Sequence, residues 1–117
     1  MNSVMVLVLM SYGLVNETFE IRADLATKQL SWVVVTASDK GRKESSRPLT
    51  PVEVKELTRL RDRALPAWVD PPKNPGAEYG ETLAVGPQKS LNAQGGFAAV
   101  KGPAGELARR LRALAGL

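Results

Sequence analysis

The stretch that decides the fold is residues 4–36, VMVLVLMSYGLVNETFEIRADLATKQLSWVVVT. Its first part, residues 4–10, is an unbroken apolar run, which is typical of a strand buried on both faces. Apolar and polar residues then alternate over residues 18–24, which predicts a half-buried strand. A third strand is predicted over residues 30–36. Because short links join the three runs, the pattern indicates an antiparallel meander.

A capped helix is predicted downstream of the meander. In Thr50-Pro51-Val52-Glu53, threonine suits the N-cap, proline the first helical position, and glutamate the third, where it completes a capping box. The helix should end at Leu65-Pro66, because a residue before proline disfavours helical backbone. The polar segment before the helix, residues 39–47, carries four basic and two acidic residues and is predicted to be a mobile loop.

The second half of the chain begins with a proline-rich segment. Residues 70–76 contain three prolines and are predicted to form an extended loop. Two further strands are predicted, over residues 81–85 and 89–97. Glu78 and Glu81 lack the spacing of a calcium loop, and we interpret them as solvated loop charges.

Gly102-Pro103 opens a C-terminal helix, in which Arg109 and Arg112 are expected to point outward, with Arg110 in reach of Glu106. A length of 117 residues suits one domain. The sequence therefore predicts a single α+β domain spanning residues 1–117. It should contain an antiparallel sheet of about five strands, with two helices packed on one face. The expected order is strand-strand-strand-helix-strand-strand-helix.

Cysteine and histidine are both absent from the chain. A disulfide framework, a thiolate zinc site and an imidazole general base are therefore excluded, and with them Ser-His-Asp and Cys-His catalysis. A pair such as Ser90 with Lys89 stays formally open, but neighbouring strand residues face opposite ways. The composition predicts a non-enzymatic protein without metal or cofactor.

Lysine and arginine outnumber aspartate and glutamate by 16 to 12, for a net charge of +4. One interpretation is solubility, since basic and acidic residues are interleaved along the chain. The alternative is a basic surface for nucleic acid. The residues of that alternative surface lie in the loop before the first helix and in the last helix: Lys40, Arg42, Lys43, Arg47, Arg109 and Arg112.

The apolar residues 4–10 lack the features of a targeting or membrane segment. No lysine or arginine precedes them, and no small-residue cleavage site follows. Seven residues fall short of the roughly 20 that span a bilayer. We expect no membrane span and a cytoplasmic location.

Two loops are the predicted contact points for a partner protein, because recognition residues concentrate on loops held by a rigid scaffold. Around the first turn the candidates are Tyr12, Gly13, Leu14 and Asn16; around the proline-rich stretch they are Trp68 and Tyr79. Aromatic residues provide large contact area with a polar tip, and prolines lower the cost of ordering a loop. The alternative for Trp68 is that it covers the end of the first helix.

The turn Ser11-Tyr12-Gly13-Leu14-Val15-Asn16 resembles the Ser-Gly-Gly-Phe-Ala-Gly type of turn in the emfourin-like small proteins, with Tyr12 in place of a glycine. The layout over residues 49–65 and 106–114 is similar to that family as well. The family includes a protein inhibitor of thermolysin-type metalloproteases. The resemblance therefore implies the predicted fold and a role as a protein inhibitor or accessory subunit.

Overall fold

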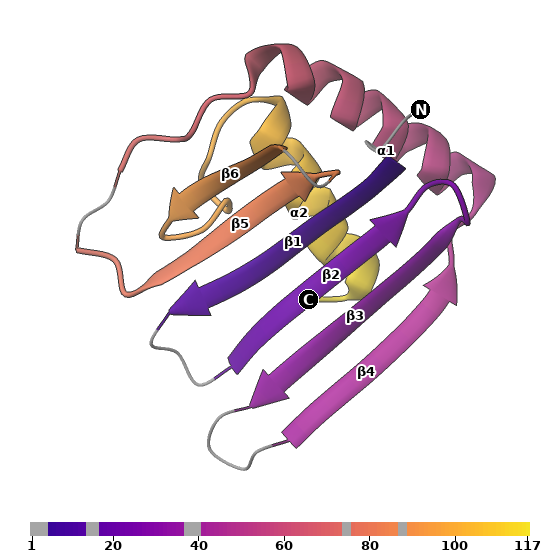
Figure 1. The fold of residues 1–117 in the computed structure, drawn as a ribbon, viewed down its shortest axis with the longest axis horizontal. Coiled ribbons are helices and arrows are strands. Elements are labelled where there is room, and N and C mark those ends of the chain that lie inside the picture. The colour runs from indigo at the N-terminus through magenta and orange to yellow at the C-terminus, as the bar shows by residue number, and fades with distance from the viewer. Residues whose placement is uncertain (1–4, 14–16, 37–40, 74–75, 87–88) are drawn as a thin grey trace.

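The structure is a computed structural model that describes residues 5–13, 17–36, 41–73, 76–86 and 89–117. Within these residues there are six strands, two α-helices and one short 3₁₀ turn (Figure 1). The strands are β1 (Val6–Gly13), β2 (Glu17–Asp24), β3 (Gln29–Thr36), β4 (Gly41–Pro48), β5 (Tyr79–Val85) and β6 (Lys89–Gln94). The helices are α1 (Pro51–Ala64), η2 (Leu65–Ala67) and α2 (Pro103–Ala115).

All strand pairs are antiparallel, and the sheet order is β4-β3-β2-β1-β5-β6. The predicted α+β class and the meander of the first three strands are confirmed. The described residues hold one strand more than the expected five. β1 lies inside the sheet, because β2 pairs with one of its edges and β5 with the other.

The additional strand is β4, which lies in the segment predicted to be a loop. It pairs with β3 from Gly41↔Thr36 to Pro48↔Gln29. Its side chains are mostly exposed and several are charged. Such a composition disfavours a central strand, but it suits the edge of a sheet, where charges discourage pairing with other chains. The loop prediction is wrong for residues 41–47, and residues 39 and 40 lie outside the described part.

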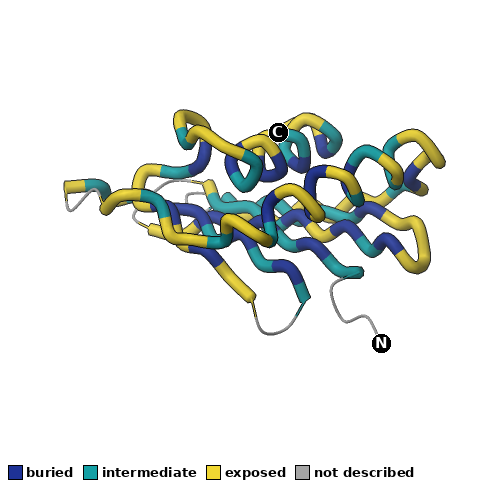
Figure 2. Tube along the Cα trace, turned by 90° about the horizontal axis from the view of Figure 1, so that it is seen from above, coloured by how far each residue is buried: buried dark blue, intermediate teal, exposed yellow. Residues whose placement is uncertain are grey.

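β1 is buried on one face only, which corrects the expectation of two buried faces. Leu7 and Leu9 are fully buried, whereas Val6 and Val8 are half-buried and Met10 is 40% exposed. The reason is the position of the helices: in the described part of the chain, α1 and α2 both lie on the same side of the sheet (Figure 2). A sheet covered on one side needs only alternate residues to be buried.

The start of α1 is the capping box that the sequence predicts. The Glu53 amide donates to the Thr50 hydroxyl at 3.1 Å, and the Thr50 amide donates to the Glu53 carboxylate at 2.9 Å. The α-helix ends at Ala64, and Leu65 and Pro66 continue into η2. α2 begins at Pro103 as expected and ends before Gly116, whose φ of +74° closes the helix.

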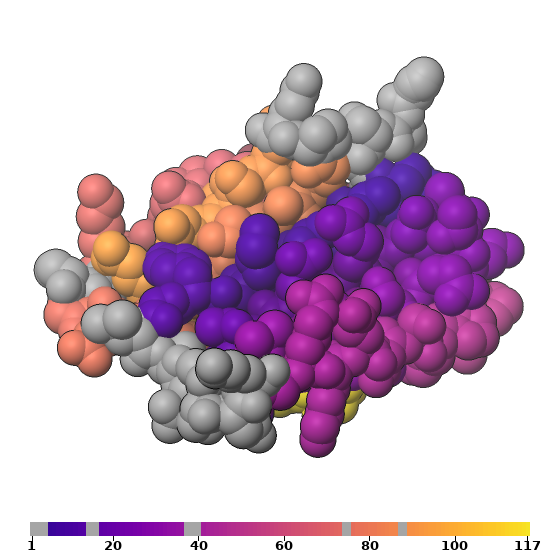
Figure 3. Space-filling model, turned by 60° about the horizontal axis from the view of Figure 1, so that its bottom comes forward, coloured from indigo at the N-terminus to yellow at the C-terminus, as the bar shows by residue number. Residues whose placement is uncertain are grey.

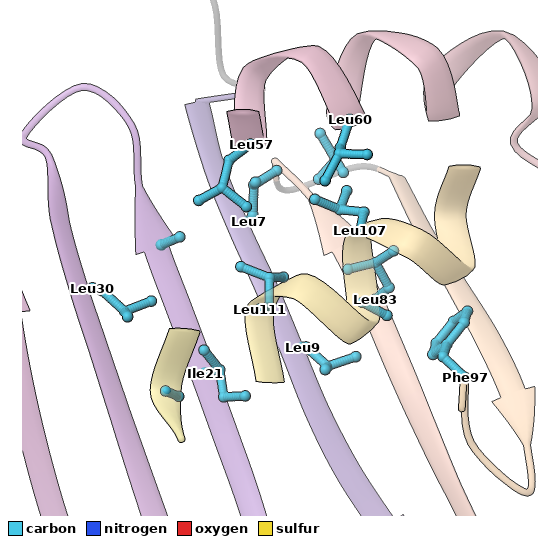
Figure 4. Close-up of a cluster of buried hydrophobic side chains, with 14 of the residues drawn as sticks. Leu7, Leu9, Ile21, Leu30, Leu57, Leu60, Leu83, Phe97, Leu107 and Leu111 are labelled. Atoms are coloured by element: carbon cyan, nitrogen blue, oxygen red, sulfur yellow. The ribbon is translucent and has the colours of Figure 1, made fainter. Parts of the chain in front are cut away.

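The core lies between the helices and the sheet (Figure 4). Leucines from α1 and α2 meet leucines of the central strands, and Phe97 closes the end of the core beside β5 and β6. In the described residues, no helix has the length and apolar character needed to cross a membrane.

Candidate binding cleft beside strand β6

The proline-rich loop turns back along the outer edge of the sheet after η2 (Figure 1). Residues 70–73 have no regular structure, in agreement with the predicted extended loop, while residues 74 and 75 lie outside the described part. The Asp70 carboxylate accepts a hydrogen bond from the Asn92 amide of β6 at 3.0 Å. This bond occupies a backbone donor of the edge strand and holds the loop beside β6.

A cleft of about 710 Å³ lies between this loop and the segment that joins β6 to α2. One wall is formed by Ala67, Val69, Pro71 and Pro72. Residues 94–96 and 98–104 form the other. The lining side chains are small and mostly apolar, and Lys101 is the one charged residue among the described residues that line it. The size and the apolar character are typical of a binding site.

Arg109 of α2 holds the second wall in place. Its guanidinium donates to the Phe97 carbonyl at 3.0 Å and to the Val100 carbonyl at 2.7 Å. The sequence predicts that Arg109 points outward, and the residue as a whole is exposed. The side chain nevertheless folds back onto the loop, because the carbonyls there need hydrogen-bond donors. The wall is thereby ordered without a partner.

Glu81 supports the same wall from inside the protein. It is 1% exposed, and its carboxylate accepts a hydrogen bond from the Phe97 amide at 2.9 Å and one from the Tyr79 hydroxyl. Arg112 donates to the second carboxylate oxygen at 3.1 Å and lies over the Phe19 ring. Glu81 is therefore not a solvated loop charge, and Arg112 does not simply point outward.

Arg110 also has a different partner from the one expected. It donates to Glu56 of α1 at 2.8 Å, so it joins the two helices, while Glu106 lies 4.0 Å from Arg63. The expected contact between Arg110 and Glu106 within α2 is not made, because α1 brings its own carboxylate closer.

The alternation of residues along β5 indicates that Glu81 faces the core, although the sequence was interpreted as giving it a solvated loop position. Glu81 shares a strand face with Leu83 and Val85, both buried. A carboxylate on the buried face of a strand requires hydrogen-bond donors or a cation. Its cation, Arg112, is 31 residues away, and no local pattern connects the two.

Burial raises the pKa of Tyr79 above its ordinary value of 10, and the hydrogen bond to Glu81 raises it further. Tyr79 is thus a neutral hydrogen-bond donor inside the fold. Of the predicted contact residues it is the one that donates to Glu81, and a Cβ added at Gly96, in the wall of the cleft, would lie 3.0 Å from its ring.

Tyr12 and Tyr79 do not form one surface. Gly13 pairs with Tyr79 and Tyr12 with Gly80, so the two tyrosine side chains lie on opposite faces of the sheet. The Tyr12 ring covers Gly80, and its hydroxyl donates to the Asn92 side chain. Gly13 has a φ of +120° and leaves no room for a Cβ against the Glu78 carbonyl. The other two candidates in this turn, Leu14 and Asn16, lie outside the described residues.

Trp68 is half-buried and packs against the core, so the structure supports its covering role at the end of α1. Its neighbours on either side, Ala67 and Val69, line the cleft. The indole Nε1 is buried and has no hydrogen-bond partner among the described residues. Trp68 itself is not among the lining residues, so this wall is formed by its neighbours and by Pro71 and Pro72 of the proline-rich loop.

The candidate basic residues that the structure describes lie on β4 and α2, and Arg47 of β4 reaches α2 through a hydrogen bond to the Leu114 carbonyl. Arg47 makes two hydrogen bonds to Glu53, at 2.9 and 3.0 Å, and Arg42 pairs with Glu44 at 3.0 Å. Lys43 is exposed on the edge strand β4. Arg109 and Arg112 make the internal contacts described above, and Lys40 lies outside the described residues.

In the described residues, no cluster of three or more metal-ligating side chains is present. Comparisons of the chain with protein-family models, curated proteins and solved structures find no match.

Proposed function

We propose that this protein is a non-enzymatic interaction module that binds a segment of another protein in the cleft beside β6. The observation that carries the proposal is the cleft itself, whose small apolar walls are held by Arg109, Glu81 and Asp70. A site ordered before binding loses less conformational entropy when the partner arrives. The absence of cysteine and histidine agrees with a role in binding rather than catalysis.

The walls favour an extended partner segment with small or medium apolar side chains. Alanine, valine and proline dominate the lining, and the glycines Gly95, Gly96 and Gly102 add no side chain to it. Lys101 at the cleft favours a carboxylate on the partner. A role as inhibitor or accessory subunit fits such a site, and the resemblance to the emfourin-like proteins supports the same role.

A pair of alanine-to-arginine variants tests the proposal. Ala99 lines the cleft and Ala113 lies on α2 outside it, and both are exposed, so either substitution should leave the fold intact. The wild type and both variants serve as bait in a pull-down with quantitative mass spectrometry. We expect Ala99→Arg to lose the partner that the wild type and Ala113→Arg retain. If a folded Ala99→Arg variant still retains the partner, the cleft is not the binding site.

The nucleic-acid alternative receives less support, because Arg47 and Arg112 are committed to ion pairs with Glu53 and Glu81. The two functions differ in their response to salt. Counterion release makes affinity for nucleic acid fall steeply as salt rises, whereas binding in an apolar cleft changes little. Measuring partner affinity over a salt series separates them.

A further inference from the structure

The sheet has a second face that neither described helix covers. Side chains of β1 and β2 lie at the surface there, between those of β5 and β6 and those of β4 (Figure 3). We call this surface the open face. It consists of the residues that alternate along each strand with the buried ones, beginning with Val6, Val8, Met10 and Tyr12 on β1.

Half of the open face is uncharged. The residues that β5 and β6 contribute beside the β1 row are Gly80, Thr82, Ala84, Ser90, Asn92 and Gln94. No charged side chain occurs in these three rows, although 24% of the chain is charged. The outer side of α1, by contrast, carries Lys55, Arg59 and Arg63. Depletion of charge is the compositional mark of an interface core.

Three of the six large apolar side chains that are exposed in the described residues lie on the open face; the other three are Val52, Val69 and Leu117. Met10 is 40% exposed, Tyr12 38% and Val35 of β3 36%. Tyr12 is held flat over Gly80 by its hydrogen bond to Asn92, so its ring is ordered before any contact forms. Methionine and tyrosine are enriched at protein interfaces, and an ordered ring loses little entropy there.

The remaining strands, β2, β3 and β4, form the other half of the open face, and this half carries mixed charge. The charged residues are Glu20, Arg22 and Asp24 on β2, and Arg42 and Glu44 on β4. Three acidic and two basic residues make this face close to neutral, although the chain carries +4. A polyanion would find no net positive charge here. Because this face carries both signs of charge, acidic groups of one copy can lie opposite basic groups of a second copy across a twofold axis.

We infer that the open face is the interface of a homodimer, in which two sheets pack face to face around a twofold axis. The molecule measures 38 by 31 Å along its two longer axes, and the sheet is seen face-on along the third. That is enough for the roughly 800 Å² per partner that a standard interface buries. The uncharged rows of β1, β5 and β6 form one half of this interface, and the charges of β2 and β4 lie in the other half.

The test compares glutamate at two exposed apolar positions. Met10 lies on the open face, and Val52 is 76% exposed on α1. The mass in solution is measured by analytical ultracentrifugation at protein concentrations from about 1 μM to about 1 mM. Dimers whose Kd lies in this range differ by up to about 4 kcal/mol in association free energy. We expect the wild type and Val52→Glu to reach twice the 12.6 kDa of one chain. Met10→Glu should raise the dimer Kd at least about a hundredfold, because it buries two unpaired carboxylates.

A cysteine label reports on the same face without adding charge. The chain has no cysteine, so Met10→Cys and, as control, Ala113→Cys each introduce a single thiol. We expect maleimide labelling at Met10→Cys to slow severalfold as protein concentration rises, while Ala113→Cys is unaffected. A wild type that stays monomeric at every concentration would overturn the inference. So would a dimer that persists in Met10→Glu while the labelling rate of Met10→Cys does not change with protein concentration. The face would then be open to a different partner or to solvent.

Discussion

The guanidinium of Arg112 on α2 lies 3.1 Å from the buried carboxylate of Glu81 on β5. This contact joins the last helix to the sheet, and through the Phe97 amide it also reaches the wall of the cleft. Arg112 further donates to the carbonyl of Leu117 at 3.2 Å, so the end of the chain is held by the same side chain. The pair therefore supports both the fold and the proposed binding site.

Removing Arg112 should destabilise the protein strongly. Arg112→Ala leaves the Glu81 carboxylate buried without its cation, which typically costs about 3 kcal/mol. Urea titration followed by circular dichroism measures the loss. Arg59→Ala on the exposed side of α1 is the control, with an expected change within about 0.5 kcal/mol. Equal stability of the two variants would contradict a structural role for the Glu81–Arg112 pair.

The cap of α1 can be tested at Thr50. Thr50→Ala removes the hydroxyl that accepts from the Glu53 amide and should lower the free energy of unfolding by about 1 kcal/mol. Thr50→Ser keeps an acceptor at the same position and should recover most of the loss. The measurement is again urea denaturation. A neutral Thr50→Ala variant would mean that water replaces the cap without cost.

Acid should weaken the junction between β4 and α1. The hydrogen bonds from Arg47, followed by the one from the Thr50 amide, lower the pKa of Glu53 from 4.5 to about 2. The carboxylate therefore stabilises the folded state fully above pH 4.5, and this stabilisation is lost as the pH falls toward 2. In Glu53→Gln, the stability of the fold should depend less on pH between 4.5 and 2. Thermal unfolding of both proteins over that pH range compares them, and parallel profiles would assign the acid sensitivity to other carboxyl groups.

Gly80 should not accept a side chain while Tyr12 is present. A Cβ at Gly80 would lie 2.3 Å from the Tyr12 ring, so Gly80→Ala must displace the ring and break its contact with Asn92. We expect a loss of about 1–3 kcal/mol, the usual range for overpacking. In a Tyr12→Ala background the same substitution should cost much less. A cost that is equal in both backgrounds would show that the Tyr12 ring is not what limits the space.

Several elements of this fold could be predicted from the sequence because their causes are local. The capping box of α1 depends on residues three apart, and the meander depends on alternation within single strands. Each of these signals is complete within a few residues. The loop prediction for residues 41–47 failed for the opposite reason, because β4 is a strand only through its pairing with β3.

The candidate sites depend still more on contacts between distant residues. Asp70 meets Asn92 and Glu81 meets Arg112, separated by 22 and 31 residues, and these contacts build the cleft from loops with no motif of their own. The open face likewise follows from both helices covering one side of the sheet.

The sequence by itself determined the class of the fold, the start of α1 and the exclusion of cysteine and histidine chemistry, since each follows from composition or from neighbours along the chain. Only the tertiary structure decided that β4 is a strand, that Glu81 is buried, and which sheet face stays uncovered. The physical reason is that hydrogen-bond and ion-pair partners are chosen by proximity in space. Periodicity describes which side a residue faces, but not what lies opposite it.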